Sequence, residues 1–403
     1  MLNSPLALLI SIAVILILTR FKVPIALGVL VGCILLIIFV IRINDIPQLL
    51  LKTITNEQTW QLLVVVPCTI AFGSLMEQKG LLTRLAATLE GMGPRLAIHV
   101  LPAVIGLVPM PAGALVAATA VKGLGEKLQL APEKIAFINY WFRHIWEISI
   151  PVYPSVILVS TILKIPLSTV VGILFPMTVL IVVFGTVISY HILRKTPHEK
   201  RKTEDTVLNY IFGFLKVAWP ILLLIILIFA KVEAWIAFPV TLILIIIQQK
   251  IKWSEMKIAL KRAFDPFIIL LLLAVTLYQM TAENSNAAGM LVSNMQSIGL
   301  PSVLILVGIP LLIGLATGYG PAVVGISLPL LSPYIINGSG IHIGALLVAC
   351  VSGMMGQLLS PAHLCFCLSV EYYRTTLSKV YRYTVPLCLT IEAVALLIYF
   401  FAR

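Results

Sequence analysis

Long apolar stretches, separated by short polar ones, dominate the pattern of hydrophobic and polar positions along the chain. Residues 6–19 and 27–41 are nearly uninterrupted apolar runs, and 242–248 is another that extends upstream. A bilayer-spanning helix needs about 20 mostly apolar residues, so we interpret these runs as membrane spans. The pattern predicts about ten crossings, near residues 2–19, 24–41, 60–76, 132–163, 168–193, 208–230, 234–249, 266–282, 342–370 and 383–401.

Prolines and glycines interrupt two further apolar stretches, 98–125 and 302–335, near their centres. The first contains Pro109-Met110-Pro111-Ala112-Gly113 and the second contains Thr317-Gly318-Tyr319-Gly320. Each stretch is too short for two spans of about 20 residues, and proline prevents a straight helix. We expect two re-entrant hairpins with these residues at their tips, and a single kinked, tilted helix is the alternative. Irregular backbone at that depth survives only where it is buried in protein or lines a watery cavity.

The span that follows each interrupted stretch is also broken. Pro151 and Pro154 interrupt residues 132–163, and Ser360-Pro361 interrupts residues 342–370. The half-helices that restart near Pro154 and Pro361 should point N-terminal N–H groups at the same region. Such groups favour an anion.

These interruptions recur as an internal repeat. Residues 105–118 match 313–326, 75–93 parallel 280–299, and 146–155 parallel 356–365 at a nearly constant offset. We therefore divide the chain into a first repeat, 1–206, and a second repeat, 207–403. The first comprises scaffold spans 2–41, hairpin 98–125 and broken helix 132–163; the second comprises scaffold spans 208–249, hairpin 302–335 and broken helix 342–370.

Composition supports a membrane protein, because 60% of residues are hydrophobic and only 11% are charged, with a mean hydropathy of +1.07. The net charge of +12 would suggest nucleic acid, but most Lys and Arg residues fall on one face of the predicted topology. That face is cytoplasmic by the positive-inside rule, which places both termini outside the plasma or inner membrane. The two hairpins then have opposite orientations. Inverted repeats with broken helices at the midplane are typical of secondary transporters.

Ionisable residues within spans are costly and are therefore candidates for function. Asn139, Arg143 and Glu147 recur every four residues on one helix face, and His144 neighbours Glu147. Arg143 could bind a substrate carboxylate with its guanidinium fork, while Glu147 and His144 carry a coupling proton. An internal Arg143–Glu147 ion pair that only neutralises itself is the alternative.

The expected substrate site combines the hairpin tips with the broken helices. Its predicted residues are Met110, Pro111, Ala112, Gly113, Asn139, Arg143, Tyr153, Pro154, Ser155, Thr317, Gly318, Tyr319, Gly320, Gln357, Ser360 and His363. Tyr319 could cover a substrate or simply fill space. Glu77 and Glu283, at span ends, are expected to be interfacial rather than proton relays. The six cysteines lack CxxC spacing, so we expect no metal framework, and Cys365 and Cys367 are interpreted as packing residues.

The stretch IAFGSLMEQKGLLTRLAATL (70–89), followed by an apolar hairpin and a proline-broken span, resembles the ion-transporter superfamily. That group includes gluconate, citrate and divalent-anion permeases and the arsenite and sodium–proton antiporters, and the chain is similar to an uncharacterised prokaryotic family within it. The resemblance implies a scaffold domain, a mobile transport domain, elevator-type alternating access and a homodimer. The tips here differ from the Ser-Asn-Thr motif of the divalent-anion symporters.

These observations predict an all-α integral membrane protein that moves a small organic anion, coupled to H⁺ or Na⁺. A cation–proton antiporter is the alternative of the same class. The sequence contains no Walker-type GxxxxGK[ST] motif, so we expect no ATP hydrolysis by this chain. A membrane-embedded enzyme is not expected either, because no HExxH or GxSxG motif occurs and the pair Ser360 and His363 is a weak signal. Apart from Na⁺ as a candidate coupling ion we expect no cofactor, and the expected partners are the lipid bilayer and a small anion rather than nucleic acid.

Overall fold

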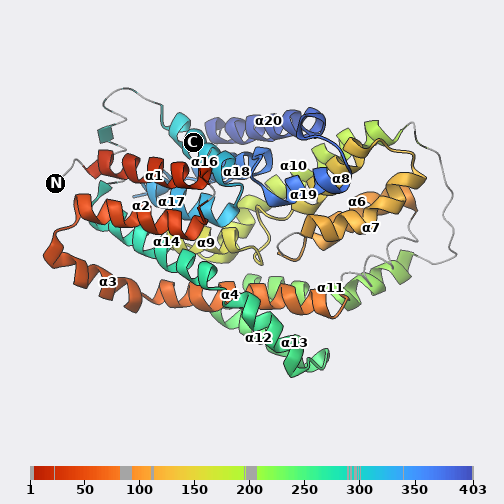
Figure 1. Ribbon diagram of the computed structural model, residues 1–403, viewed down its shortest axis with the longest axis horizontal. Helices are drawn as coiled ribbons and strands as arrows, with labels where there is room; N and C mark the ends of the chain where they lie inside the picture. The colour runs from red at the N-terminus through yellow and green to blue at the C-terminus, as the bar shows by residue number, and fades with distance from the viewer. Residues whose placement is uncertain are drawn as a thin grey trace.

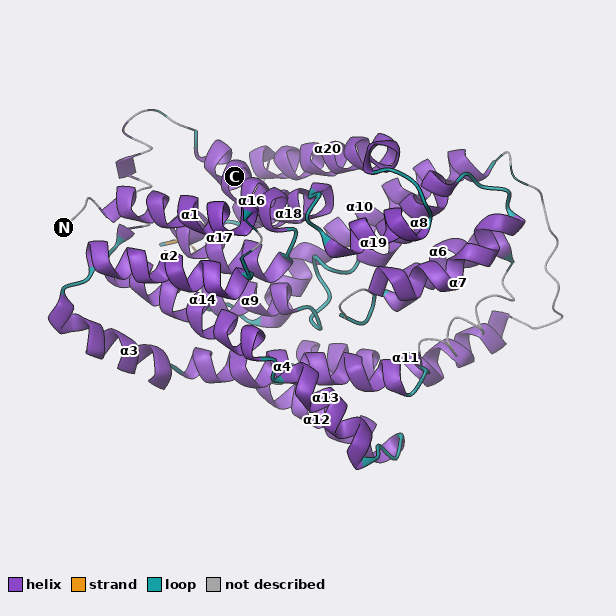
Figure 2. Cartoon of the chain, in the orientation of Figure 1, coloured by secondary structure: helices purple, strands orange, loops and turns teal. Residues whose placement is uncertain are grey.

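The computed structural model describes residues 4–21, 23–81, 93–109, 113–194, 196, 207–287, 290, 293–294, 297, 299, 301–338 and 340–401. This part of the chain is almost entirely helical (Figures 1 and 2). The elements of the first half are α1 (Ser4–Arg20), α2 (Ile25–Val40), the 3₁₀ turn η1 (Ile43–Asp45), α3 (Ile46–Thr55), α4 (Glu57–Gln78), α6 (Pro94–Ile105), α7 (Gly113–Lys127), α8 (Pro132–His144), α9 (Pro154–Leu163) and α10 (Leu167–Leu193).

The second half has the same helical character. Its elements are α11 (Val207–Phe229), α12 (Ala234–Gln248), α13 (Trp253–Ala263), α14 (Pro266–Asn284), α16 (Ser302–Thr317), α17 (Gly320–Ile335), β1 (Ile336–Asn337), β2 (Gly340–Ile341), α18 (Ile343–Leu359), α19 (Leu364–Tyr372) and α20 (Leu377–Phe401). The two strands pair in antiparallel fashion as a short ribbon after α17.

Local sequence explains where several helices begin. A proline opens α6, α8, α9 and α14, where its missing N–H has no intrahelical partner to lose. Asp265 caps α14 by accepting a hydrogen bond from the backbone N–H of Phe267 at 2.9 Å, and Asn56 caps α4 in the same way through Gln58 at 2.8 Å. These caps satisfy backbone donors that would otherwise be unpaired at helix ends.

Five apolar helical segments of the described residues are long enough to cross a bilayer. They are Glu57–Gln78, Leu167–Leu193, Pro266–Asn284, Ile343–Tyr372 (interrupted between α18 and α19) and Leu377–Phe401. Shorter apolar helices accompany them, among them α1, α2 and α12. The protein is therefore a multi-pass membrane protein, and the total of ten crossings stays a prediction.

The two helix pairs expected as hairpins lie toward opposite ends of the molecule. In Figure 1, α6 and α7 run side by side at one end, while α16 and α17 lie among α1, α2 and α14 at the other. The marks for the two chain termini both fall in the half that holds α1. The broken helices, α8–α9 and α18–α19, contact both pairs, because α8 and α19 pack against α7 while α9 and α18 pack against α17.

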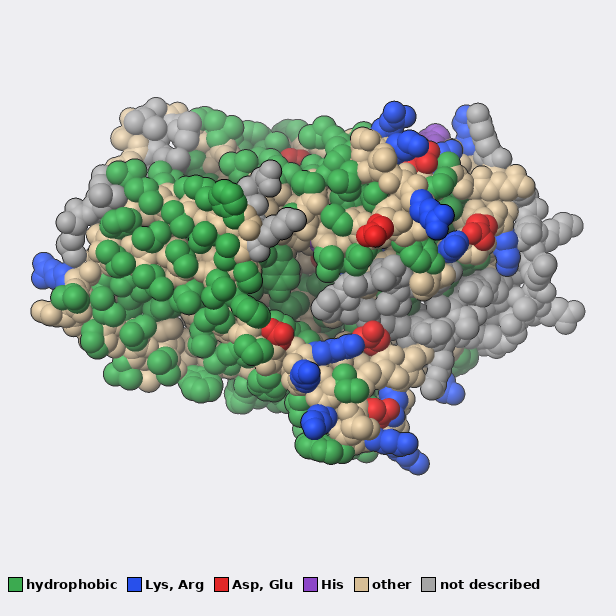
Figure 3. Space-filling model, in the orientation of Figure 1, with side chains coloured by type: hydrophobic (Ala, Val, Ile, Leu, Met, Phe, Trp, Pro, Cys, Tyr) green, Lys and Arg blue, Asp and Glu red, His purple; other side chains and the backbone are tan. Residues whose placement is uncertain are grey.

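Charge is distributed unevenly over the surface. On the face shown in Figure 3, Lys and Arg gather over α13 and over the end that carries α6 to α8, whereas the region over α1, α2 and α14 is mainly apolar. Where charges of opposite sign meet at helix ends they form ion pairs, Arg262–Glu77 at 2.5 Å, Lys79–Glu255 at 2.7 Å and Lys164–Glu283 at 3.6 Å. Glu77 and Glu283 thus lie in exposed ion pairs, and their position at the membrane interface stays a prediction.

Candidate functional site

The two broken helices meet at the centre of the fold. The first is interrupted between His144 and Pro154, and the second between Leu359 and Leu364. Helix α17 packs against both α9 and α18, and α19 packs against α7 and α8. The sequence predicted both breaks, and the structure brings them together with the turn between α16 and α17.

Side-chain hydroxyls donate hydrogen bonds to backbone carbonyls near the helix ends at these breaks and in α16. The hydroxyls of Tyr140 and Tyr381 donate to the last two carbonyls of α18, those of Leu358 and Leu359, at 2.9 and 2.7 Å. The Ser360 hydroxyl donates to the Leu315 carbonyl near the end of α16 at 2.7 Å. No bulk water reaches a bilayer core, so backbone groups there need such internal partners. The polar side chains therefore make the interruptions tolerable.

Two side chains from the break between α8 and α9 donate hydrogen bonds to backbone carbonyls in and directly after α6. The Tyr153 hydroxyl donates to the carbonyl of Gly106, and the Trp146 indole donates to the carbonyl of Ala103 at 2.6 Å. A Cβ added at Gly106 would collide with the backbone carbonyl of Arg143. Glycine is required there because the end of α6 lies directly against the end of α8.

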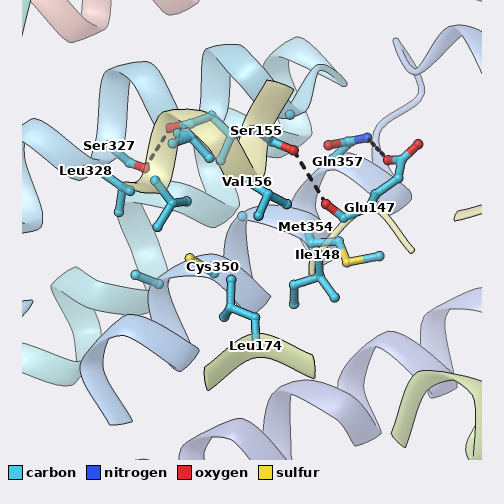
Figure 4. Close-up of a pocket in the computed structure, with 16 residues that line it drawn as sticks. Glu147, Ile148, Ser155, Val156, Leu174, Ser327, Leu328, Cys350, Met354 and Gln357 are labelled. Atoms are coloured by element: carbon cyan, nitrogen blue, oxygen red, sulfur yellow. Dashed lines mark hydrogen bonds between the residues drawn. The ribbon is translucent and has the colours of Figure 1, made fainter. Parts of the chain in front are cut away.

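Arg143 and Glu147 form an ion pair at this junction. Arg143 Nη1 donates to Glu147 Oε1 at 2.7 Å and to the Tyr153 hydroxyl at 3.3 Å. The second carboxylate oxygen, Oε2, accepts from Gln357 Nε2 at 2.8 Å (Figure 4). Arg143 is 2% exposed and Glu147 14% exposed, so the pair is largely shielded from solvent. Gln357 belongs to α18, so the ion pair links the two halves of the chain.

Two histidines from the two halves face each other beside this pair. His144 Nε2 lies 3.0 Å from His363 Nε2, and both side chains are buried. The Nδ1 atom of His144 bonds to the Tyr140 carbonyl, and that of His363 bonds to the Gly318 carbonyl, each at 2.6 Å. His144 Nε2 also lies 3.8 Å from Glu147 Oε1.

The turn between α16 and α17 packs directly against His363 of this pair. Gly318 has a φ of +59°, and a Cβ there would lie 2.6 Å from the backbone nitrogen of His363. Thr317 Oγ1 accepts from the backbone N–H of Tyr319 at 3.3 Å and donates to the Ile313 carbonyl at 2.8 Å. Tyr319 is the N-cap residue of α17 and its side chain is 38% exposed.

Asn139 contacts the beginning of α7. Its Nδ2 donates to the Ala114 carbonyl at 3.0 Å and to the Ser369 hydroxyl at 3.3 Å. Its Oδ1 is buried and has no hydrogen-bond partner among the described residues. Gly113 opens α7 and is buried, while Met110, Pro111 and Ala112 lie outside the described residues.

A small cavity of about 40 Å³ opens beside Glu147, and Figure 4 shows the side chains that line it. Glu147, Ser155 and Gln357 contribute polar groups, Gly320 lies at its wall, and the rest is mostly apolar surface from α9, α10, α17 and α18. The Ser155 hydroxyl points to the Glu147 carbonyl at 3.5 Å. One water needs about 10–15 Å³ of such volume, so the cavity holds a group of a few non-hydrogen atoms.

Sequence reasoning missed three residues that belong to this region. Tyr140 and Ser369 hydrogen-bond to predicted site residues, and Cys365 lies with His144 and His363 in a buried cluster. Tyr140 lies one helical turn before His144, but its hydroxyl bonds to Leu358 in the second half of the chain. Ser369 and Cys365 meet Asn139 and His144 only in the folded chain, so no local spacing indicates them. Pro154 is present as the first residue of α9 and gives the site its helix start.

Comparison with known proteins identifies a family over nearly the whole chain. Residues 2–401 match the sequence profile of the DUF401 family, described as "Protein of unknown function (DUF401)", and the chain belongs to that family. No curated protein matches it. Among solved structures it is similar to the crystal structure of the YdaH transporter of Alcanivorax borkumensis, described as having an unusual topology. The TM-score is 0.64 at 13% identity, over 90% of each chain, which shows a shared fold.

Proposed function

We propose that this DUF401-family membrane protein is a secondary active transporter of a small organic anion that carries a carboxylate. Its fold is shared with a transporter, and its polar groups gather where two broken helices meet. Broken helices at the midplane of an inverted repeat form the sites of many secondary transporters. The proposed cargo is moved by coupling to H⁺ or Na⁺.

The observation that carries the proposal is the convergence of helix N-termini around one buried cation. Helix α9 begins at Pro154 and α17 at Gly320, and Ser155 and Gly320 both border the cavity beside Glu147. Helices α7 and α19 begin nearby, since Asn139 contacts Ala114 and His144 contacts His363. Each N-terminus contributes roughly half a positive charge. Together with Arg143, they favour an anion in this region.

The ion pair supports a coupled mechanism. With Glu147 ionised, Arg143 and Glu147 cancel, and a monovalent anion alone would leave a net negative charge in the membrane. A proton taken up by Glu147 frees the Arg143 fork for the substrate carboxylate and restores neutrality. His144 Nε2, 3.8 Å from Glu147 Oε1, is close enough to exchange that proton. This arrangement makes Glu147 and His144 the proposed coupling residues.

The proposed membrane arrangement has ten crossings, two re-entrant hairpins and inverted repeats, 1–206 and 207–403. The helix pairs α6–α7 and α16–α17 lie toward opposite ends of the molecule, which supports opposite orientations (Figure 1). The gathering of Lys and Arg toward the α6–α7 end supports a cytoplasmic position for that end (Figure 3). Both termini then lie outside. Elevator-type movement and a homodimer complete the proposal, from the resemblance to the ion-transporter superfamily.

A cation–proton antiporter is the second candidate, and one observation favours it. Arg143 already contacts Glu147 at 2.7 Å, so the guanidinium has a partner without any substrate. In that case, Glu147 and the two histidines would be ligands that exchange a cation for protons.

Uptake into liposomes containing the purified protein separates the two candidates. We expect small carboxylates, tested as a panel with and without Na⁺, first to raise the thermal unfolding temperature of the detergent-purified protein. Those that do so should then be taken up under an inward proton or sodium gradient. Uptake of a cation with proton release, unaffected by any carboxylate, would instead establish the antiporter.

A further inference from the structure

The two histidines present the same ring atom to each other. A backbone carbonyl can only accept a hydrogen bond, so the 2.6 Å contacts of His144 Nδ1 to Tyr140 and of His363 Nδ1 to Gly318 place a proton on each Nδ1. A neutral imidazole carries one N–H, so both Nε2 atoms then hold lone pairs. These atoms lie 3.0 Å apart. Two lone pairs at this distance repel, and a cation between them removes the repulsion.

A third donor lies at the same place. The Cys365 sulfur and one ring nitrogen of each histidine all lie within 4.8 Å of one another, and all three side chains are buried. Cys365 follows His363 by two residues in the first turn of α19, so one helix end brings both to His144 at the end of α8. A shared proton needs only the two nitrogens, whereas a thiophilic metal uses all three donors.

We propose that His144, His363 and Cys365 form a binding site for a thiophilic divalent transition metal, represented by Zn²⁺. Tetrahedral Zn²⁺ with bonds of about 2.0–2.1 Å to nitrogen places two nitrogens about 3.3 Å apart, and a linear arrangement would place them about 4 Å apart. The observed 3.0 Å is closer to the tetrahedral distance. The sulfur, within 4.8 Å of a ring nitrogen of each histidine, would have to move closer to reach a tetrahedral N–S distance of about 3.6 Å.

The surroundings suit a metal-bound pair of imidazoles. Metal-ligating histidines almost always donate their other ring N–H to a carbonyl, carboxylate or water, which fixes the ring and its tautomer. Tyr140 and Gly318 supply such carbonyls here. Arg143 lies nearby and would oppose a second positive charge, but Glu147 offsets it at 2.7 Å. Glu147 Oε1 is also only 3.8 Å from His144 Nε2.

The inference rests on the three donors and does not depend on the proposed anion transport. A metal and a proton compete for Nε2 of His144, so a metal-loaded protein would leave Glu147 as the proton carrier. Metal binding can be measured without any transported substrate. The two proposals therefore succeed or fail separately.

The test is a metal titration of the full-length protein in mild detergent, after treatment with a chelator. We expect one equivalent of Zn²⁺ per chain by elemental analysis. Co²⁺ should occupy the same site and give a sulfur-to-cobalt charge-transfer band. Cys365→Ser should abolish that band and weaken Zn²⁺ binding by at least about ten-fold, as even lost outer-shell partners cost about 10–100-fold. His363→Gln should weaken binding similarly while leaving the band.

Cys367→Ser is the matched control. Cys367 lies two residues further along α19, and its sulfur contacts the Pro361 carbonyl at 3.2 Å rather than the cluster. We expect this variant to bind Zn²⁺ and Co²⁺ as the wild type does. Each variant is first compared with the wild type by thermal unfolding, so that a misfolded variant is not scored. Wild-type protein that retains no Zn²⁺, or equal binding by the two serine variants, would overturn the proposal.

Discussion

The buried ion pair between Arg143 and Glu147 should be strongly coupled in the free energy of unfolding. Arg143 is 2% exposed and cannot lose its proton, so replacing Glu147 by Gln leaves an uncompensated buried cation. Breaking a buried pair in this way costs about 3–5 kcal/mol. The 14% exposure of Glu147 places the expected cost near the lower end, about 3 kcal/mol.

Arg143→Leu should cost less, because the remaining carboxyl keeps its hydrogen bond from Gln357 and can take up a proton. We expect about 1–3 kcal/mol for that change, the usual cost of an impaired buried polar group. The double variant removes both charges. Its cost should therefore fall short of the sum of the two single costs by about 2 kcal/mol or more.

Equilibrium unfolding in mixed micelles with increasing SDS, followed by tryptophan fluorescence, measures this double-mutant cycle. The exposed pair Lys164–Glu283, at 3.6 Å with side chains 56% and 47% exposed, is the matched control. Its cycle, with Lys164→Met and Glu283→Gln, should give a coupling of about 0–1 kcal/mol. A coupling for Arg143–Glu147 no larger than that of the control would refute the assignment of a shielded, mutually dependent pair.

Two further predictions concern backbone geometry and pH. Gly318→Ala should lower the thermal unfolding temperature, because the left-handed conformation costs a non-glycine residue about 1–2 kcal/mol and the new Cβ would lie 2.6 Å from the His363 nitrogen. Gly308→Ala is the control, and it should leave the unfolding temperature unchanged because a Cβ there meets nothing within 4 Å. The hydrogen bond from Lys79 lowers the pKa of Glu255 in the folded protein. This pair should therefore stabilise the packing of α13 fully at pH values above the unfolded carboxyl pKa of about 4.3, and the stabilisation should be lost as the pH falls through the lower pKa of the folded protein. The protection of α13 against hydrogen exchange, expressed relative to the intrinsic exchange rate at each pH, should therefore decrease at acid pH in the wild type and less so in Lys79→Met. An identical response in both would contradict the pairing.

Proline positions were sufficient to predict the breaks but not their extent. Pro151 and Pro154 indicate an interruption, and the structure leaves residues 145–153 outside any helix. The longer break depends on contacts from other helices, such as the Trp146 bond to Ala103 and the Ser149–Thr178 bond at 2.6 Å. A local pattern cannot report partners that come from α6 and α10.

The candidate site was predictable where its residues lie close together in the sequence. The four-residue spacing of Arg143 and Glu147 predicted neighbours, and the structure has them 2.7 Å apart. The expected single helix face is wrong for Glu147, because α8 ends at His144 and Glu147 lies in the turns that follow it. Gln357 and His363 were singled out by their positions in the second repeat, but their contacts with Glu147 and His144 were not predicted. The His144–His363 contact joins residues 219 positions apart. Cys365 was interpreted as a packing residue because its spacing in the sequence does not indicate a metal site. Only the folded chain places His144 beside it.

The most direct test of the central proposal measures uptake of radiolabelled small carboxylates into proteoliposomes under an inward proton or sodium gradient, for the wild type, Arg143→Lys and Arg143→Leu. We expect gradient-driven carboxylate uptake in the wild type. Arg143→Lys should weaken the apparent affinity by roughly ten- to a hundred-fold, the loss of a bidentate charge-assisted contact worth about 1.5–3 kcal/mol, and Arg143→Leu should abolish the uptake. Wild-type-like carboxylate uptake in Arg143→Leu, or transport of cations alone, would contradict the proposal.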